Sequence, residues 1–300
     1  MNNNLLRGSV GAASAMFLVG TLAAVSSVID RYPLYGGQAV RYALGAVVLG
    51  AVAKTKGLGP VRLDRRETLL LVALAATGLV LFNVCVIQAV RHASPTLVGT
   101  VVGTVPVVLA LLGPVLARAR PSGRVLAAAV VVVAGATVTT GLGGGGSLTG
   151  LGYAIGALAC EACFSLLAIP LLPKLGPVRV SAYTAAVAVP LLLGVGVVAD
   201  GPAVLRLPTA PEAAALLYLA VVISAGAFIL WYDALGRLGA DRAGLFAGMV
   251  PVGAAATTLL LGLGAPTATE LVGVALVVAG LSVGLAPGRS RAREVIASPA

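Results

Sequence analysis

The sequence predicts an all-α membrane protein with ten transmembrane helices, arranged as two inverted five-helix repeats with both termini in the cytoplasm. Three observations predict this fold: the composition, the distribution of basic residues and an internal duplication. The chain is 59% hydrophobic and 10% charged, whereas soluble domains carry about 25% charged residues. Disordered chains are polar and charged, so the composition indicates a membrane protein and argues against a soluble enzyme or a nucleic-acid-binding protein.

Ten apolar runs are long enough to cross a hydrocarbon core of about 30 Å. They lack the strand-like alternation that an outer-membrane barrel requires. Most connections between them are short, so successive helices are expected to be antiparallel neighbours. The predicted helices lie near residues 9–29, 34–53, 68–90, 95–116, 124–141, 151–171, 179–198, 212–231, 242–263 and 270–286.

The first of these runs has features of a signal peptide, because Arg7 precedes an apolar stretch that contains small residues. We expect the run to be retained as a transmembrane helix. Its removal would leave nine helices and would break the duplication described below.

Basic residues are distributed unevenly between the two sides of the membrane. Sixteen Lys and Arg residues fall on the side of the two termini, while the other side holds Arg31, Arg91 and Arg206. Cytoplasmic loops are rich in Lys and Arg, so both termini are predicted to be cytoplasmic. The net charge of +10 is accounted for by these loops, and nucleic acid is not expected as a partner.

An internal duplication links the two halves of the chain. A shift of 145 residues aligns 89–138 with 234–283 without a gap, and fifteen of the fifty positions are identical. The informative identities are those of glycine and proline: Gly99 with Gly244, Gly103 with Gly248, Pro106 with Pro251, Pro121 with Pro266, and Gly135 with Gly280. Each repeat contains five spans, so the second copy enters the membrane from the opposite side, as in many secondary transporters.

The duplication also predicts the organisation of the chain. We expect a first five-helix repeat over 1–142, a Gly-rich linker over 143–150, a second repeat over 151–288 and a basic cytoplasmic tail over 289–300. The glycine run 143–146 is typical of a flexible connection.

Pro106 and Pro251 lie near the middle of the fourth and ninth predicted helices. A mid-helix proline removes a backbone hydrogen bond and kinks the helix. Gly99, Gly103, Gly244 and Gly248 precede these prolines at a spacing that lets another helix approach closely. Two interpretations are equally open: a kink that serves packing, or a bent helix that lines a cavity in each half.

Together these features resemble the drug/metabolite transporter superfamily, specifically its EamA type. The segment Gln38-Ala39-Val40-Arg41-Tyr42-Ala43 is similar to the family's arginine-plus-aromatic motif. The stretches 89–106 and 234–251 are similar to the family's run from an alanine-containing helix end to a proline. The resemblance implies a central cavity lined by the first four helices of each half, with the fifth and tenth helices peripheral. It also implies substrates such as amino acids, sugars, nucleotide-sugars or drugs, often exported.

Only two charged residues lie clearly inside predicted spans, away from the helix ends, and they are the leading candidates for the site. A charge at the bilayer centre costs about 2.5–3.5 kcal/mol on insertion scales, so such residues are functional by default. At 1.5 Å per residue, Arg41 and Glu161 lie roughly 11 and 15 Å below the outer ends of their helices. We expect Arg41 to bind an anionic substrate group or to pair with Glu161, which would otherwise bind an amine or exchange a proton. The alternatives are an Arg41 side chain that extends to the outer interface and a protonated Glu161 that serves packing.

Further polar residues near this pair complete the candidate site, although buried amides more often join helices than bind ligands. Trp231 and Tyr232, and likewise Tyr32 and Tyr35, are predicted to anchor helix ends at the membrane interface. The additional candidates for substrate binding or coupling are Gln38, Tyr42, Asn83, Gln88 and Ser165.

The sequence therefore predicts a secondary transporter of the inner or plasma membrane that moves a small metabolite, such as an amino acid, by alternating access and in the direction of export. A channel-like facilitator and a non-transporting membrane scaffold are the alternatives. Phosphate-binding loops, metal-ligand clusters and catalytic triads are absent from the sequence, so neither an enzyme nor a cofactor is expected. The expected partners are the bilayer and a small-molecule substrate, and the pattern is compatible with proton coupling and a homodimer.

Overall fold

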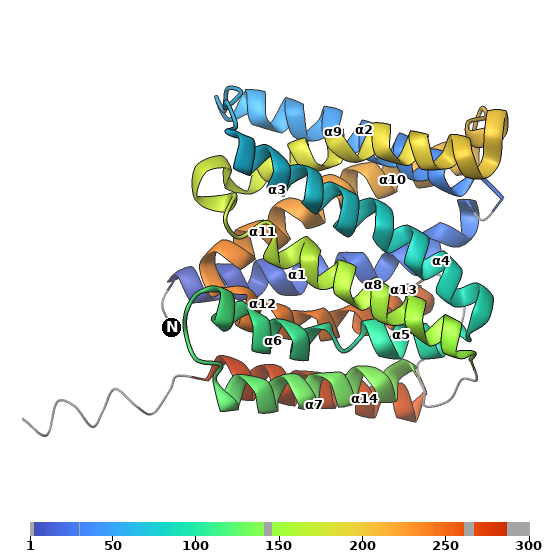
Figure 1. Cartoon of the computed structure of the whole chain (residues 1–300). Helices are drawn as coiled ribbons and strands as arrows, with labels where there is room; N and C mark the ends of the chain where they lie inside the picture. Colours follow the sequence, from blue (N-terminus) through green and yellow to red (C-terminus); the bar gives the residue numbers. More distant parts are fainter. Residues whose placement is uncertain (1–2, 30, 141–145, 261–266, 287–300) are drawn as a thin grey trace, which may run out of the picture.

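The computed structural model describes residues 3–29, 31–140, 146–260 and 267–286, and within these ranges all regular secondary structure is helical. The helices run along a common direction in stacked layers (Figure 1), with α2, α9 and α10 at one edge and α7 and α14 at the other. The prediction of an all-α fold is confirmed. Most of the predicted glycine run, 143–145, and the basic tail, 289–300, lie outside the described residues.

The helices of the first half follow the predicted order. The Asp64 side chain accepts from the Glu67 backbone and Glu67 reaches back to the Asp64 backbone, which begins α3 with a capping box. The bounds are α1 Asn3–Ser26, α2 Leu34–Thr55, α3 Arg65–Ala75, α4 Phe82–His92, α5 Pro95–Val102, α6 Val105–Leu116 and α7 Gly123–Thr140.

The helices of the second half repeat this order. Ser147 caps the start of α8, and Gly239, with φ of +80°, turns the chain between α11 and α12. The bounds are α8 Leu148–Leu166, α9 Leu172–Asp200, α10 Ala210–Tyr218, α11 Phe228–Leu238, α12 Ala240–Leu245, α13 Met249–Leu260 and α14 Ala268–Leu285. Gly176 in α9 is non-helical, so this helix is interrupted near its start.

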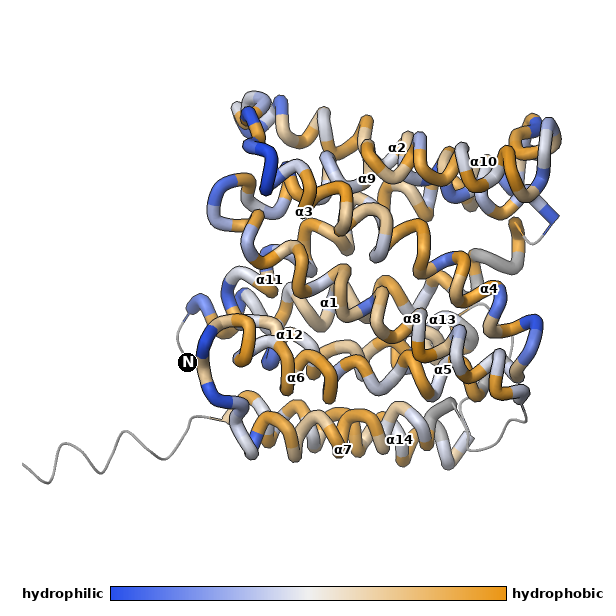
Figure 2. Tube along the Cα trace, in the orientation of Figure 1, coloured by the Kyte–Doolittle hydropathy of each residue, from blue (hydrophilic) through white to orange (hydrophobic). Residues whose placement is uncertain are grey.

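Within the described residues, seven helical segments are long and apolar enough to cross a membrane, and two shorter apolar helices accompany them. Figure 2 shows hydrophilic residues gathered at the two ends of the bundle and hydrophobic residues between them. Large apolar side chains such as Val47 and Val198, 70% and 89% exposed, face outward. An apolar band between polar ends is what a lipid bilayer requires.

The fourth and ninth predicted helices, 95–116 and 242–263, are broken rather than continuous. α5 ends at Val102 and α6 restarts at Val105, while a 3₁₀ turn, Phe246–Gly248, separates α12 from α13. Each proline lies in the first turn of the restarted helix, where its missing N–H is not needed. The two halves therefore break equivalent helices at equivalent prolines.

π-helical segments interrupt two other equivalent helices. Ala76–Leu81 joins α3 to α4, and Leu219–Ala227 joins α10 to α11. The shift of 145 residues carries the first segment onto the second. Such π segments are rare and occur frequently at functional sites.

Several contacts between the two halves follow the same pseudo-two-fold relation. α7 packs on α14, α2 packs on α9, and α1 packs on α11 as α8 packs on α4. Other contacts depart from it, because α6 packs closely on α12 while their equivalents, α13 and α5, do not pack closely on each other, and α1 packs chiefly on α13 while α8 packs more on α5 than on α6. At the crossing of α7 and α14, a Cβ at Gly135 would lie 2.7 Å from the Gly273 carbonyl oxygen, and a Cβ at Gly280 would lie 3.0 Å from the Ala128 carbonyl oxygen. Both partners are related by 145 residues, so glycine at these two positions permits a symmetric close crossing.

Candidate functional site

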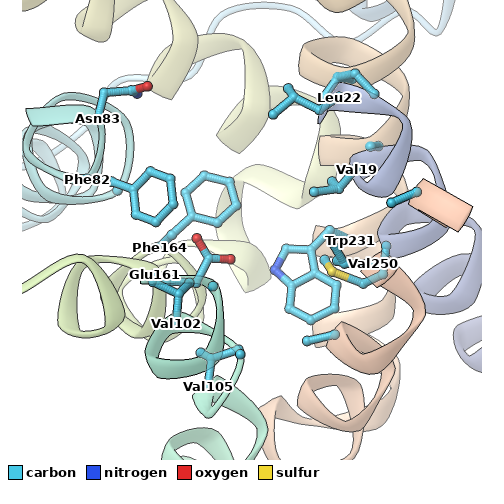
Figure 3. Close-up of a pocket in the computed structure, with 18 of the residues that line it drawn as sticks. Val19, Leu22, Phe82, Asn83, Val102, Val105, Glu161, Phe164, Trp231 and Val250 are labelled. Carbon is cyan, nitrogen blue, oxygen red and sulfur yellow. The ribbon is translucent and has the colours of Figure 1, made fainter. Parts of the chain in front are cut away.

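A cavity of about 440 Å³ lies between the two halves. It is lined by the second half of α1, the first half of α2, both π segments, the start of α4, and parts of α5, α7, α8, α11 and α13. Most of its wall is aliphatic or aromatic, and Figure 3 shows several of these side chains around Glu161. The polar or charged lining side chains besides Tyr42 and Trp231 are those of Gln38, Arg41, Asn83, Thr100, Thr137 and Glu161.

Arg41 joins the two halves at one side of this cavity. Its Nε donates to Ser224 Oγ at 2.8 Å, and its Nη1 donates to Gln38 Oε1 at 3.2 Å. The guanidinium carbon lies 5.1 Å from the centre of the Tyr42 ring. Ser224 belongs to the π segment of the second half, so this irregular segment supplies a hydrogen-bond acceptor for the Arg41 guanidinium. The residue is 6% exposed, and the interpretation that it extends to the outer interface is wrong.

Glu161 lies in the second half of α8 and lines the same cavity. Its carboxylate points into the cavity beside the rings of Phe82 and Phe164, with Trp231 across from it (Figure 3). No described residue forms an ion pair or a hydrogen bond with it. The structure therefore brings Arg41 and Glu161 to one cavity, but the expected pair between them is not formed.

Aromatic side chains form a connected wall behind the carboxylate. The Phe164 ring centre lies 5.0 Å from that of Phe228 and 5.2 Å from that of Tyr232. The ring centres of Tyr42 and Phe228 are 6.3 Å apart. Aromatic pairs at such separations stabilise one another beyond simple burial.

The prediction that Trp231 and Tyr232 anchor the membrane interface is wrong. Their exposed fractions are 3% and 0%, and Trp231 Nε1 donates to Ser165 Oγ at 3.2 Å. That prediction used only the distance of the two residues from a helix end, where Trp and Tyr are enriched at membrane interfaces. The spacing of Phe228 three and four residues before the pair is the signal that could have found them, because it puts all three rings on one helix face.

The other predicted site residues divide between the cavity and the packing around it. Asn83 Nδ2 donates to the Leu79 carbonyl at 2.5 Å, and Gln38 and Tyr42 line the cavity with Asn83. Gln88 and Ser165 are not among the lining residues, and Ser165 is 1% exposed against Trp231.

The predicted glycines and prolines divide in the same way. Gly99, Gly103 and Pro251 line the cavity, whereas Pro106 is buried beside it. A Cβ at Gly244 would lie 2.9 Å from Leu109 Cβ, and a Cβ at Gly248 would meet Val132 and Val277 side chains. Four residues at or beside the cavity were not predicted from the sequence: Phe82, Phe164, Phe228 and Ser224.

A family model for EamA-like transporters matches residues 6–141 and again residues 148–285. The chain belongs to the EamA-like transporter family. The EamA resemblance inferred from the sequence is confirmed. Together with the long apolar helices, membership makes the chain a multi-pass protein of the plasma membrane with a small-molecule substrate.

Two known proteins are similar to the EamA chain. An uncharacterized transporter, YetK of Bacillus subtilis strain 168, is 25% identical over 282 residues, which cover 91% of this chain and 85% of YetK. A crystal structure described only as that of a protein superposes with a TM-score of 0.75 at 20% identity, covering 92% of this chain and 96% of the other. That likeness shows the fold alone. The family and YetK indicate a transporter rather than an enzyme.

Proposed function

We propose that this chain is a secondary transporter that moves a small metabolite, an amino acid or a similar molecule, out of the cell by alternating access. The proposed unit has ten spans with both termini cytoplasmic, built from five-helix repeats at 1–142 and 151–288 that the segment 143–150 joins. One observation carries the proposal: two equivalent glycines in a symmetric framework have opposite surroundings.

Gly244 lies at a closed contact between the halves. It faces Leu109 where α12 packs on α6, and a Cβ at Gly113 nearby would lie 3.0 Å from Ala240 Cβ. The equivalent of Gly244 is Gly99, and the equivalent of Leu109 is Ala254. No described atom lies within 4 Å of the position that a Cβ at Gly99 would occupy. Both Gly99 and Ala254 line the cavity, so the second equivalent contact is open where the first is closed.

This asymmetry supports an outward-open state. The cavity draws its lining from the later part of α1 and the earlier part of α2, which are outer under the predicted orientation. α1 begins and α14 ends at the same end of the bundle (Figure 1). Exchange of the conformations of the two halves would close Gly99 on Ala254 and separate Gly244 from Leu109, which is the inward-open state expected of an inverted repeat.

Glu161 supports proton coupling within this scheme. A carboxylate inside the membrane that faces a cavity is a typical proton carrier in transporters.

A homodimer stays a prediction of the sequence.

Two cysteine pairs test alternating access. In a chain with Cys85, Cys160 and Cys163 replaced by alanine, Leu109→Cys with Gly244→Cys reports closure of the first contact, and Gly99→Cys with Ala254→Cys reports closure of the second. Disulfides form only when Cβ atoms approach to about 3.5–4.5 Å. A change of conditions that raises the cross-linking yield of one cysteine pair is expected to lower the yield of the other pair, because the two contacts close in opposite states.

A channel-like facilitator predicts a different outcome for the same pairs. Its pore would open both contacts together, so the two yields would rise and fall together, and reconstituted vesicles would never accumulate substrate against its gradient. Either result would overturn the proposal.

A further inference from the structure

Resting on the proposed transport function, we infer from the cavity that the substrate is an organic cation: a protonated amine with a compact apolar or aromatic body, whose ammonium group binds Glu161. This narrows the proposed class of amino acids and similar molecules to amines that carry no carboxylate. The inference concerns only the chemistry of the ligand and does not depend on how the halves move. Four features of the cavity carry it.

The first feature is the unpaired carboxylate. Glu161 lines the cavity and has no ion pair or hydrogen bond with any described residue. Two other carboxylates in the described part of the chain that are wholly or partly buried are paired: Glu212 is bound by Arg206 and by the Thr209 backbone, and Glu67 is bound by Lys174. A buried charge is costly unless it is paired, so the ionised carboxylate of Glu161 is compensated only by a cation that enters the cavity, either a proton or an ammonium group.

The second feature is that the cavity's own cation is already held. Arg41 donates from Nε and Nη1 to Ser224 and Gln38 and lies against the Tyr42 ring. These partners use two of the five N–H donors of the guanidinium, so an anionic substrate group would find only the remaining donors of Arg41. An ammonium group meets no such restriction at Glu161, so the arrangement favours a positive over a negative ligand.

The third feature is the set of rings around the carboxylate. Phe82, Phe164 and Trp231 line the cavity beside Glu161 (Figure 3). Aromatic faces attract ammonium groups through the quadrupole of the ring, and this attraction grows when the site excludes water. A carboxylate with surrounding rings therefore combines two kinds of attraction for one cationic group.

The fourth feature is the size and polarity of the remaining wall. A volume of about 440 Å³ lies within the range of small-molecule pockets, roughly 300–1,000 Å³. Apart from Arg41 and Glu161, the wall is formed largely by apolar side chains such as Val19, Leu22, Val102 and Val250. A sugar would leave most of its hydroxyl groups without partners, whereas an apolar or aromatic body fits this wall.

Tryptophan fluorescence can report binding at this site, because Trp231 is the single tryptophan of the chain and lines the cavity. The full chain in lipid nanodiscs is titrated with three related probes at neutral pH: phenethylammonium, zwitterionic phenylalanine and phenylacetate. We expect phenethylammonium to change the tryptophan emission saturably, phenylalanine to bind at least tenfold more weakly, and phenylacetate not to bind. Equilibrium dialysis with labelled phenethylammonium measures the same binding without the fluorophore.

Glu161→Gln keeps the shape of the side chain and removes its charge, so it should weaken phenethylammonium binding at least tenfold. The matched control is Glu67→Gln, which removes a carboxylate paired with Lys174 outside the cavity and should leave binding unchanged. A native emission spectrum and an unchanged elution volume show that the variants are folded.

Three results would overturn the inference: tighter binding of phenylacetate or phenylalanine than of phenethylammonium, undiminished binding by Glu161→Gln, or no binding of phenethylammonium in dialysis. Failure of the transport proposal is distinguishable from these. It would appear as cysteine pairs that do not alternate in a protein that still binds phenethylammonium.

Discussion

The two halves of the molecule share a framework but supply different chemistry to the cavity between them. The glycine crossing of α7 with α14 and the two π segments obey the 145-residue relation. The polar groups do not, because the first half supplies Gln38, Arg41 and Asn83, while the second supplies Glu161 and Trp231. Close helix crossings constrain both halves equally, since small residues are needed wherever backbones approach. Cavity positions carry no such constraint and are free to differ.

The halves differ in conformation as well as in chemistry. The contact of Gly244 with Leu109 is closed, and its equivalent at Gly99 is open. A molecule in which both contacts were closed would have no access path, and one with both open would be a pore. The difference between two equivalent glycines is therefore the feature most directly tied to transport.

Leucine at each of these glycines should trap opposite states, and this is the largest effect that we expect. Gly99→Leu fills space that must close in the inward-open state, while Gly244→Leu collides with Leu109 in the state described here. Overpacking costs about 1–3 kcal/mol, which corresponds to a roughly 5- to 150-fold shift in population. Both variants should transport poorly.

The sign of the shift separates the two variants. With Leu22→Cys as the only cysteine in the cavity, labelling by a membrane-impermeant maleimide from outside should persist in Gly99→Leu and fall several-fold in Gly244→Leu. Equal labelling in the two variants would mean that the asymmetry of the two contacts has no role in access.

Alanine at the crossing of α7 with α14 should test the symmetric part of the comparison. Gly135→Ala and Gly280→Ala each place a Cβ within about 3 Å of backbone atoms of the other helix, so each should destabilise the fold by about 1–3 kcal/mol. The measurement is the thermal unfolding midpoint in detergent. Gly50→Ala is the control, since no described atom lies within 4 Å of its Cβ position, and it should leave the midpoint unchanged or raise it. A much larger effect at one of the two crossing glycines would break the proposed equivalence.

The framework was largely predictable from the sequence, because its signals are local. Apolar runs gave the helical membrane fold, and the aligned repeat located Pro106 and Pro251, at which the structure breaks both helices. The π segments and the broken helices themselves were not predicted. Hydropathy averages over about twenty residues and is insensitive to a change of one residue in the spacing of backbone hydrogen bonds.

Only the charged residues of the site were predictable from the sequence. Arg41 and Glu161 stand out because an apolar span makes a charge conspicuous. Their partners do not stand out, since Ser224 and Phe164 are ordinary residues of an apolar helix. Which of them face the cavity depends on packing between distant helices, and single-sequence patterns carry no information on that packing. Trp231 was misassigned because its place near a helix end was considered and the helix face that it shares with Phe228 was not.

The two serines that hold cavity residues offer the smallest and sharpest comparison. Ser224 accepts from the charged Nε of Arg41 at 2.8 Å, whereas Ser165 accepts from the neutral Nε1 of Trp231 at 3.2 Å. Interhelical hydrogen bonds in membranes contribute about 0.6 kcal/mol on average and up to about 1.7 kcal/mol, and bonds to charged groups are the stronger ones. Ser224→Ala should therefore destabilise the protein by about 1–2 kcal/mol and Ser165→Ala by about 0.6 kcal/mol, measured as shifts of the unfolding midpoint. Ser224→Ala should also weaken phenethylammonium binding, because a guanidinium released from Ser224 is free to turn toward Glu161 and compete with the ammonium group. If Ser165→Ala were the more harmful change, Arg41 would not be the residue that ties the two halves together at the cavity.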